Sequence, residues 1–397
     1  MDAEMASWKS TGTYVNAVPP LGVNIVDGMW IFRVKRPPSS LPAYKCDYEL
    51  HSLDFSIASL QGSLHEAIWL RRPRGFTGSF PKGTQRSLRR PVYGLRQAPR
   101  EWHDTLRTTL AALGFAPSTA DPSLFLCTDT SLPPFYVLVY IDDLVFAIAD
   151  TEALTFVKSE LQKRHTCTDL GELCNYLGLQ ITWERARRTI TLTLSHMVHQ
   201  VLQRFDFSWS SPQPTSLATG HSLSAPPSDK SVQPSGLYPE LVGCLVYLMT
   251  CTRPDLSYAL SLLARYVAPS SHRKTTHRST LRYSFSLGTG SVSWRSTRSS
   301  FVLSSSCEAK IYAAAMATQE LCLLTYLLID LGERPCPPPV LYVDNKALQQ
   351  RGQLRLAYIA TQANTTDVFT KALGSSDHQR FCTALGLVPT LPHLLVS

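Results

Sequence analysis

Two adjacent aspartates, Asp142 and Asp143, lie inside an otherwise apolar stretch, residues 135–148. The stretch alternates as the two strands of a β-hairpin do, so the sequence predicts that the pair lies at the hairpin tip. Carboxylates among buried strands need a compensating cation or hydrogen-bond donors. A hard divalent ion with oxygen ligands supplies that compensation. An exposed Asp-Asp turn, which is common in hairpins, is the open alternative.

A third carboxylate, Asp54, lies inside a short alternating segment, residues 50–55. Phosphoryl transfer with two metal ions requires carboxylates from separate segments that converge on one point. Asp54 on one strand and the two aspartates of a neighbouring hairpin meet this requirement. A lone acid of this kind is more often a strand-end or turn residue, so the hypothesis for Asp54 depends on the aspartate pair.

The segment between these acids predicts a helix that begins near a polar turn. Apolar residues recur at steps of three and four from Ala98 to Gly114, which is the helical period, and Pro99 fits the first turn. Gln97 and the backbone amides at this helix start suit phosphates or a base edge. An ordinary helix that begins at a proline is the alternative.

An ordered set of motifs surrounds these residues. The stretches LHSLDFSIASLQGSLHEAIWLRRPRGF, RRPVYGLRQAPREWHDTL, LGFAPSTADPSLF and LVYIDDLVFA follow one another. CTDLGELCNYLGLQI and LYPELVGCLVYLMTCTRPDLSYALSLLARY continue the set. In this order and spacing the motifs resemble the reverse transcriptase of Ty1/copia-type retrotransposons, over most of residues 23–373.

The resemblance implies a function for each matching position. Asp54, Asp142 and Asp143 match the carboxylates that hold two Mg²⁺ ions, or Mn²⁺, in an RNA-directed DNA polymerase. The reaction implied is attack of a primer 3′-hydroxyl on the α-phosphate of a deoxynucleoside triphosphate, with loss of pyrophosphate. The implied partners are an RNA template, a DNA primer and dNTPs. The net charge of +8 suits such polyanions, although a solvated basic surface is the alternative.

Other matching positions surround the implied reaction centre. Those near the incoming nucleotide and the template are Lys35, Arg96, Gln97 and Tyr140. Those in the hairpin that grips the primer end are Leu177 and Gly178. The C-terminal part resembles the RNase H of the same family, and its matching acids are Glu308, Asp344 and Asp367. The leading acid of that RNase H set is missing, so we expect no hydrolysis of an RNA–DNA hybrid.

The sequence also departs from the family's pattern. Segments are missing after residue 46, after residue 283 and after residue 348, and they include part of the fingers and the first RNase H strands. Ser59 and Lys310 replace an apolar and an acidic residue of the motifs. The loss of core elements lowers the free energy of unfolding by more than the small net stability of a typical domain, so we expect impaired activity. A catalytically dead nucleic-acid-binding remnant is the alternative, and a product that does not fold is the third hypothesis.

The expected fold is α+β, a right-hand polymerase palm with truncated fingers and a partial RNase H-like α/β domain. The expected parts are partial fingers (1–46), a palm (47–207), a linker (208–236), a helical connection (237–282), the RNase H-like domain (283–373) and a tail (374–397). Residues 47–75 read as strand, turn and helix start. The segments 152–164, 195–205 and 237–266 read as helical, and the tail after 374 shows no pattern.

The remaining sequence features bear on location. The ten cysteines occur singly without a CxxC pair, and no Cys/His cluster has the expected zinc spacing. Scattered thiols fit a reducing compartment. No signal peptide is recognised at the start, and no stretch reads as long and apolar enough to span a bilayer. We therefore expect an intracellular protein without membrane contact, in a cytoplasmic retroelement particle or in the nucleus, of unknown oligomeric state.

Overall fold

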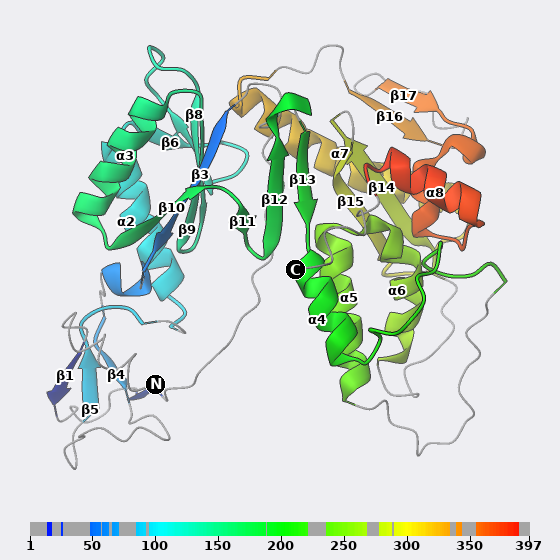
Figure 1. Cartoon of the computed structure of the whole chain (residues 1–397), viewed down its shortest axis with the longest axis horizontal. Coiled ribbons are helices and arrows are strands. Elements are labelled where there is room, and N and C mark those ends of the chain that lie inside the picture. Colours follow the sequence, from blue (N-terminus) through cyan, green and yellow to red (C-terminus); the bar gives the residue numbers. More distant parts are fainter. Residues whose placement is uncertain are drawn as a thin grey trace. The chain divides into compact units, whose positions relative to one another are not determined.

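The structure is a computed structural model (Figure 1), and it describes most of the chain between residues 48 and 388. The described residues are 14–17, 25–26, 48–56, 58–62, 66–70, 85–92, 95–187, 189–220, 236–267, 278–287, 290–333, 339–343 and 355–388. Lys35 and Asp344 lie outside these ranges, so their predicted functions stay predictions. The strand-like run at residues 29–35 also lies outside them.

The chain forms two compact units. The first comprises Met1–Arg36, Pro42–Cys174 and Trp183–Thr189, and the second comprises Pro37–Leu41, Asn175–Thr182 and Ile190–Ser397.

A six-stranded antiparallel sheet is the centre of the first unit. Its strand order is β10-β3-β9-β8-β7-β6, with bounds Cys167–Glu172, Glu49–Phe55, Asp143–Ile148, Phe135–Tyr140, Leu124–Cys127 and Phe115–Pro117. The predicted hairpin is confirmed, because β8 and β9 pair directly and the turn between them contains Asp142. Strands β8 and β9 are almost wholly buried, which explains their continuous apolar sequence.

Two helices cover one face of this sheet, as Figure 1 shows. They are α2, Ala98–Ala112, and α3, Thr151–Arg164. The predicted helix of the 98–114 segment is confirmed, with a proline in its first turn and Trp102, Leu106 and Leu110 buried. Helix α3 begins at the N-cap Asp150, whose side chain accepts hydrogen bonds from the first backbone amides. The apolar face of both helices joins alternate residues of β3, β8 and β9 in one core.

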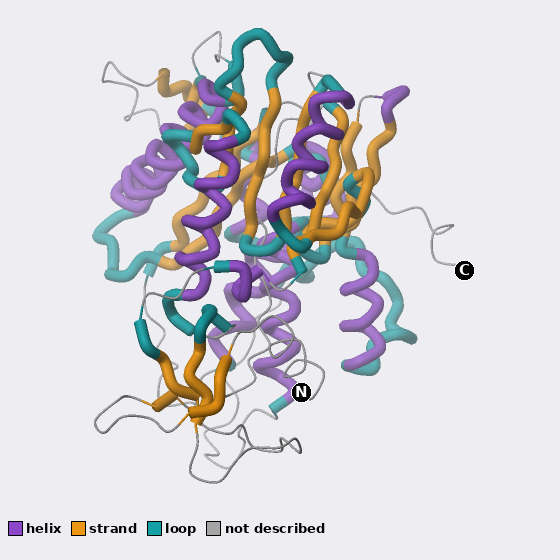
Figure 2. Tube along the Cα trace, turned by 90° about the vertical axis from the view of Figure 1, so that its left-hand side faces the viewer, coloured by secondary structure: helices purple, strands orange, loops and turns teal. Residues whose placement is uncertain are grey.

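A smaller four-stranded sheet brings together segments on both sides of residue 46. Its order is β1-β5-β4-β2, with bounds Tyr14–Ala17, Gln85–Leu88, Ile68–Leu70 and Ile25–Val26 (Figure 2, lower left). The helix start expected within 47–75 is wrong, because a 3₁₀ turn, Ala58–Gln61, is followed by strand β4. Strand β4 has only three residues, all of them apolar, so its sequence shows neither the strand period nor the helix period.

The second unit begins with a hairpin and three helices. Strands β11, Asn175–Tyr176, and β12, Leu179–Glu184, form an antiparallel hairpin, and β13, Thr189–Thr193, extends it. Helices α4, α5 and α6 follow at Ser195–Arg204, Leu237–Cys251 and Ser257–Leu263. The predicted helix near 195–205 and the helical pair within 237–266 are therefore confirmed. Leu179, Leu194 and Leu248 form the core between hairpin and helices.

The C-terminal part contains a second hairpin and two further helices. Strand β14, Thr280–Ser286, pairs with β15, Ser291–Arg298, so one strand runs through the point where a family segment was expected to be missing. Helix α7, Ser306–Asp330, packs onto β14, and the parallel pair β16 and β17 spans Val340–Val343 and Arg355–Tyr358. Helix α8, Ser375–Ala384, lies in the tail that the sequence left without a pattern. An RNase H-like domain stays a prediction.

Helix α7 corrects the expectation that no stretch is long and apolar enough to cross a membrane. Its 25 residues contain a window of mean hydropathy 1.3, and 11% of that window is buried. One such helix is weak evidence of a membrane span, and α7 carries Glu320 in its middle, which accepts a hydrogen bond from Ser293 of β15. The expectation of no membrane contact stays a prediction.

Candidate active site

A row of polar side chains crosses the six-stranded sheet at the strand ends next to the β8–β9 turn. Asp54 of β3 lies opposite Asp143 of β9 in the strand register, and Asp143 lies opposite Tyr140 of β8. On the other side of β3, Asp54 lies opposite Thr168 of β10. Side chains directly opposite on adjacent antiparallel strands have Cβ atoms about 4.5–5.5 Å apart. The two aspartates that lie 89 positions apart in the printed sequence are therefore neighbours in the structure.

The alternation of side chains along each strand shows which face this row occupies. Leu53 and Phe55 lie in the core beneath the helices, so Asp54 points to the opposite face of the sheet. Leu144 lies in the same core, which places Asp143 on the face of Asp54. Asp54 and Asp143 therefore lie on the face of the sheet away from α2 and α3.

The turn that carries Asp142 is strained and firmly held. Ile141 has a φ of 57°, a value that β-branched residues rarely adopt and that costs on the order of 1–3 kcal/mol. The indole Nε1 of Trp102 donates to the Ile141 carbonyl at 2.5 Å. The Phe55 amide donates to the Asp142 carbonyl at 2.8 Å. Helix α2 and strand β3 thus fix the backbone on which Asp142 is presented.

The electrostatics of the three carboxylates favour a bound cation. Asp54, Asp142 and Asp143 are all half-buried. Like charges directly opposite on adjacent strands repel each other, and partial burial strengthens that repulsion. A divalent ion with oxygen ligands offsets it, so the donor set fits hard ions such as Mg²⁺ or Mn²⁺.

The polar start of helix α2 has a structural function that the sequence did not show. Gln97 is the N-cap residue, and its carbonyl accepts from the amides of Arg100 and Glu101. Its side-chain amide donates to Glu66 at 2.5 Å. Arg96 is exposed beside it. Contact of Gln97 and Arg96 with a nucleotide or template stays a prediction.

The predicted primer-grip residues form the tip of the hairpin β11–β12 in the second unit. Leu177 and Gly178 both have positive φ, 51° and 83°, as the two central residues of a type I′ turn do. Tyr247 of α5 donates its hydroxyl to the Leu177 carbonyl at 3.0 Å. The tip is thus fixed within its own unit, and its contact with a primer stays a prediction.

Two of the three acids of the predicted RNase H remnant, Glu308 and Asp367, have structural partners. Glu308 is half-buried at the start of α7, where its carboxylate accepts from the Ser304 amide and hydroxyl while its own amide donates to the N-cap Ser305. Hydrogen bonding from Ser304 lowers the pKa of Glu308. The Asp367 side chain is 3% exposed, and Arg282 and Lys371 hold its two oxygens at 2.6 and 2.5 Å. A carboxylate held this way is already neutralised by two cations.

Sequence reasoning missed two residues of the site. Thr168 lies in the row only because β10 pairs with β3, and no local pattern predicts that long-range register. Trp102 was recognised as an apolar helix position, but not as the donor to the Ile141 carbonyl. Its indole N–H is the available signal, because a buried tryptophan usually finds a hydrogen-bond acceptor.

A matching family model places the chain in the class of reverse transcriptases. Residues 41–218 match the family described as reverse transcriptase (RNA-dependent DNA polymerase). That span contains the whole six-stranded sheet and all three aspartates.

Curated relatives define the family more narrowly. The putative transposon Ty5-1 protein of Saccharomyces cerevisiae is 30% identical over 247 residues, which are 62% of this chain and 79% of that protein. The retrovirus-related Pol polyprotein from transposon RE2 of Arabidopsis thaliana is 27% identical over 87% of this chain. The chain belongs to the reverse transcriptase family of Ty1/copia-type retrotransposons. It spans 28% of the RE2 polyprotein.

Solved structures with some likeness include a foamy viral protease–reverse transcriptase in complex with double-stranded DNA. That chain is 11% identical, with a TM-score of 0.40 over 89% of this chain and 68% of the viral one. A foamy viral protease–reverse transcriptase in complex with an RNA/DNA hybrid is 14% identical with a TM-score of 0.38, over 85% of this chain and 42% of the viral one.

The Trp102 hydrogen bond leads to a first testable prediction. In Trp102→Phe the aromatic packing is largely kept, but the Ile141 carbonyl loses its donor, at a cost of about 1–3 kcal/mol. We expect unfolding free energy to fall by that amount in chemical denaturation. Because the turn presents Asp142, divalent-ion affinity should fall as well. Phe125→Leu, a core change elsewhere in the sheet, is the control, and it should lower stability without lowering ion affinity.

Proposed function

We propose that this chain is an RNA-directed DNA polymerase by descent, which transfers deoxynucleotides with the help of two divalent ions. The observation that carries the proposal is the register of Asp54 opposite Asp143, beside the fixed turn of Asp142. Two strands bring Asp54 and Asp143 to one face of the sheet, and the fixed turn carries Asp142 next to Asp143. The family membership supports the same reading, while activity, substrates and partners are proposed for this shorter chain.

The three carboxylates would hold the ions, and the backbone around them would keep them in place. When bound, a pair of divalent ions stabilises the attacking and leaving oxygens of phosphoryl transfer. The strained turn and the Trp102 hydrogen bond would fix Asp142 before substrate arrives. Such preorganisation avoids rearrangement of the site at the moment of reaction. Mg²⁺ is the proposed ion, and Mn²⁺ is the alternative.

The basic residues of the first unit support nucleic acid as the partner. A wide polar pocket lies between the 3₁₀ turn and the end of α3, and its cationic lining residues are Arg89, Arg90, Lys163 and Arg164. Lys163 and Arg164 lie near Glu160, but exposed ion pairs of this kind are weak and can be exchanged for phosphates. We propose that this pocket contacts the backbone of the template or primer without reading its sequence.

The proposed place of action is intracellular, in a retroelement particle of the cytoplasm or in the nucleus. Within the described part of the chain, the eight cysteines form no disulfide, and this fits a reducing compartment. Detection of the protein outside the cell would contradict the proposed intracellular location.

Primer extension tests the proposed polymerase. The purified chain, given a primed RNA template, dNTPs and Mg²⁺, is expected to lengthen the primer, and EDTA should stop it. The second candidate, a catalytically dead nucleic-acid-binding remnant, is favoured by the segments missing after residue 46. It predicts no extension but an affinity that falls steeply with salt, because phosphate contacts release counterions. A folded chain with neither extension nor salt-dependent binding contradicts both candidates.

A further inference from the structure

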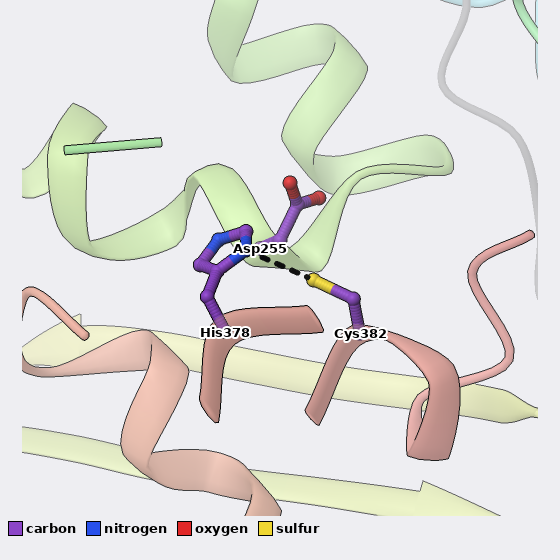
Figure 3. A group of neighbouring side chains, drawn as sticks. All are labelled: Asp255, His378 and Cys382. Atoms are coloured by element: carbon purple, nitrogen blue, oxygen red, sulfur yellow. Dashed lines mark hydrogen bonds between the residues drawn. The ribbon is translucent and has the colours of Figure 1, made fainter. Parts of the chain in front are cut away.

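A buried cluster of three different metal-binding groups lies in the second unit, far along the sequence from the three active-site aspartates. Asp255 follows helix α5, while His378 and Cys382 lie one turn apart on α8. One ligand atom from each residue lies within 4.8 Å of the others (Figure 3). Asp255 is 2% exposed and His378 is 7% exposed, whereas Cys382 is half-buried. A cluster this enclosed differs from the exposed acidic groups that are common on surfaces.

The distances within the cluster approach those of a tetrahedral zinc site. The Cys382 Sγ and the His378 Nδ1 are 3.6 Å apart. Zinc bonds of about 2.3 Å to sulfur and 2.0–2.1 Å to nitrogen place two tetrahedral ligands about 3.5 Å apart. These two atoms therefore already have the separation that one zinc ion requires, and a small side-chain movement brings in the Asp255 carboxylate.

Two of the three groups also have the outer partners that ligands in metal sites need. The other ring nitrogen of His378, Nε2, lies 3.5 Å from the Ser216 hydroxyl. Arg253 donates to both Asp255 oxygens, at 2.9 and 2.8 Å. Each carboxylate oxygen keeps a second lone pair for a metal, and ligating carboxylates are commonly hydrogen-bonded in this way. The guanidinium therefore orients Asp255 without consuming it as a ligand.

Zinc binding at this cluster would require the thiolate form of Cys382 and the neutral form of the His378 imidazole. Binding would release the thiol proton to solvent as the thiolate–metal bond forms.

We propose that Asp255, His378 and Cys382 bind one Zn²⁺ ion that fastens helix α8 to the segment between α5 and α6. The mixture of one sulfur, one nitrogen and one oxygen ligand suits zinc rather than Mg²⁺, which prefers oxygen ligands only. The fourth position is left to solvent. The sequence shows no zinc spacing because His378 and Cys382 are four residues apart on a helix and Asp255 lies 123 positions before His378.

Cobalt substitution and X-ray absorption test this site in the full chain. After treatment with a chelator, Co²⁺ should produce a thiolate-to-cobalt absorption band, and Zn²⁺ should abolish it at one equivalent. Zn²⁺ should also raise the melting temperature. Cys382→Ser and His378→Gln should lower Zn²⁺ affinity at least tenfold and remove the band or shift it strongly. Cys322→Ser, which removes an exposed thiol of α7, is the matched control and should leave both unchanged.

Two results would contradict the proposed zinc site. A cobalt band that persists in Cys382→Ser, or a wild-type protein without any band, contradicts it. If Cys382→Ser does not fold, zinc-edge absorption of the wild-type protein decides, with one sulfur ligand expected and none or several contradicting the proposal. Zinc binding is measured without dNTPs or template, so its failure and the failure of the proposed polymerase are separate results.

Discussion

Primer extension by the Asp142→Asn variant is expected to fall on the order of 10³-fold relative to the unchanged chain. Asparagine has nearly the shape of aspartate but lacks the negative charge that a divalent ion requires. The backbone hydrogen bonds of the turn, from Trp102 and Phe55, do not involve the side chain and should remain. We therefore expect the loss in activity without a matching loss in stability. Single-turnover extension rates and melting temperatures measure the two effects.

The control for this substitution lies at the other end of the same sheet. Asp129 lies in the loop between β7 and β8, where its carboxylate accepts from the Ser131 amide and hydroxyl. Asp129→Asn keeps an oxygen acceptor for this local turn. It changes net charge by the same amount and should leave extension within about twofold. Extension by Asp142→Asn at the rate of the control would reject the assigned metal ligands.

The second large effect is expected on stability, at Asp367. The Asp367→Asn variant leaves the Arg282 guanidinium, which is 19% exposed, without a charge partner. Removing one partner of a buried ion pair typically costs 3–5 kcal/mol, so we expect a loss of about 3 kcal/mol. Exposed Lys371 contributes little to this figure, because solvent screens its charge. Denaturant unfolding followed by a probe in the second unit measures the loss.

The matched control is Asp377→Asn on the same side of the second unit. Asp377 pairs with Arg380 at 2.9 Å, but both side chains are more than half exposed. We expect a change below about 0.5 kcal/mol there. A loss below about 1 kcal/mol at Asp367 would show that its ion pairs do not stabilise the unit. It would also reopen the possibility that this carboxylate is available as an RNase H metal ligand.

Local patterns were sufficient to predict the elements that carry the site. The apolar runs on both sides of Asp142 and Asp143 predicted the hairpin β8–β9, and the three-and-four spacing from Ala98 predicted α2. The second signal is the stronger one, because it repeats the helical period over several turns. The pairing of β3 with β9 followed only from the chemical requirement that Asp54 meet the aspartate pair, and the register agrees with it.

Long-range register and buried charge could not be predicted in the same way. Thr168 enters the carboxylate row through the pairing of β10 with β3, which contains a register shift between Asp169 and Gly171. The burial of Asp367 depends on Arg282, 85 positions earlier in the chain. Strand β4 of the small sheet is too short to show a period. Thr168 and Asp367 are placed by residues that are distant in the sequence, so no local sequence pattern predicts their positions.

Iron-directed cleavage tests most directly whether Asp54, Asp142 and Asp143 share bound cations. Fe²⁺ can replace Mg²⁺ at sites with oxygen ligands, and with ascorbate and peroxide it generates radicals that cut the backbone next to the bound ion. The three-carboxylate site predicts two sets of fragments, one from cuts near Asp54 and one from cuts near Asp142, both suppressed by excess Mg²⁺. Cuts near only one of these positions, or cuts that survive Asp142→Asn unchanged, would contradict the site.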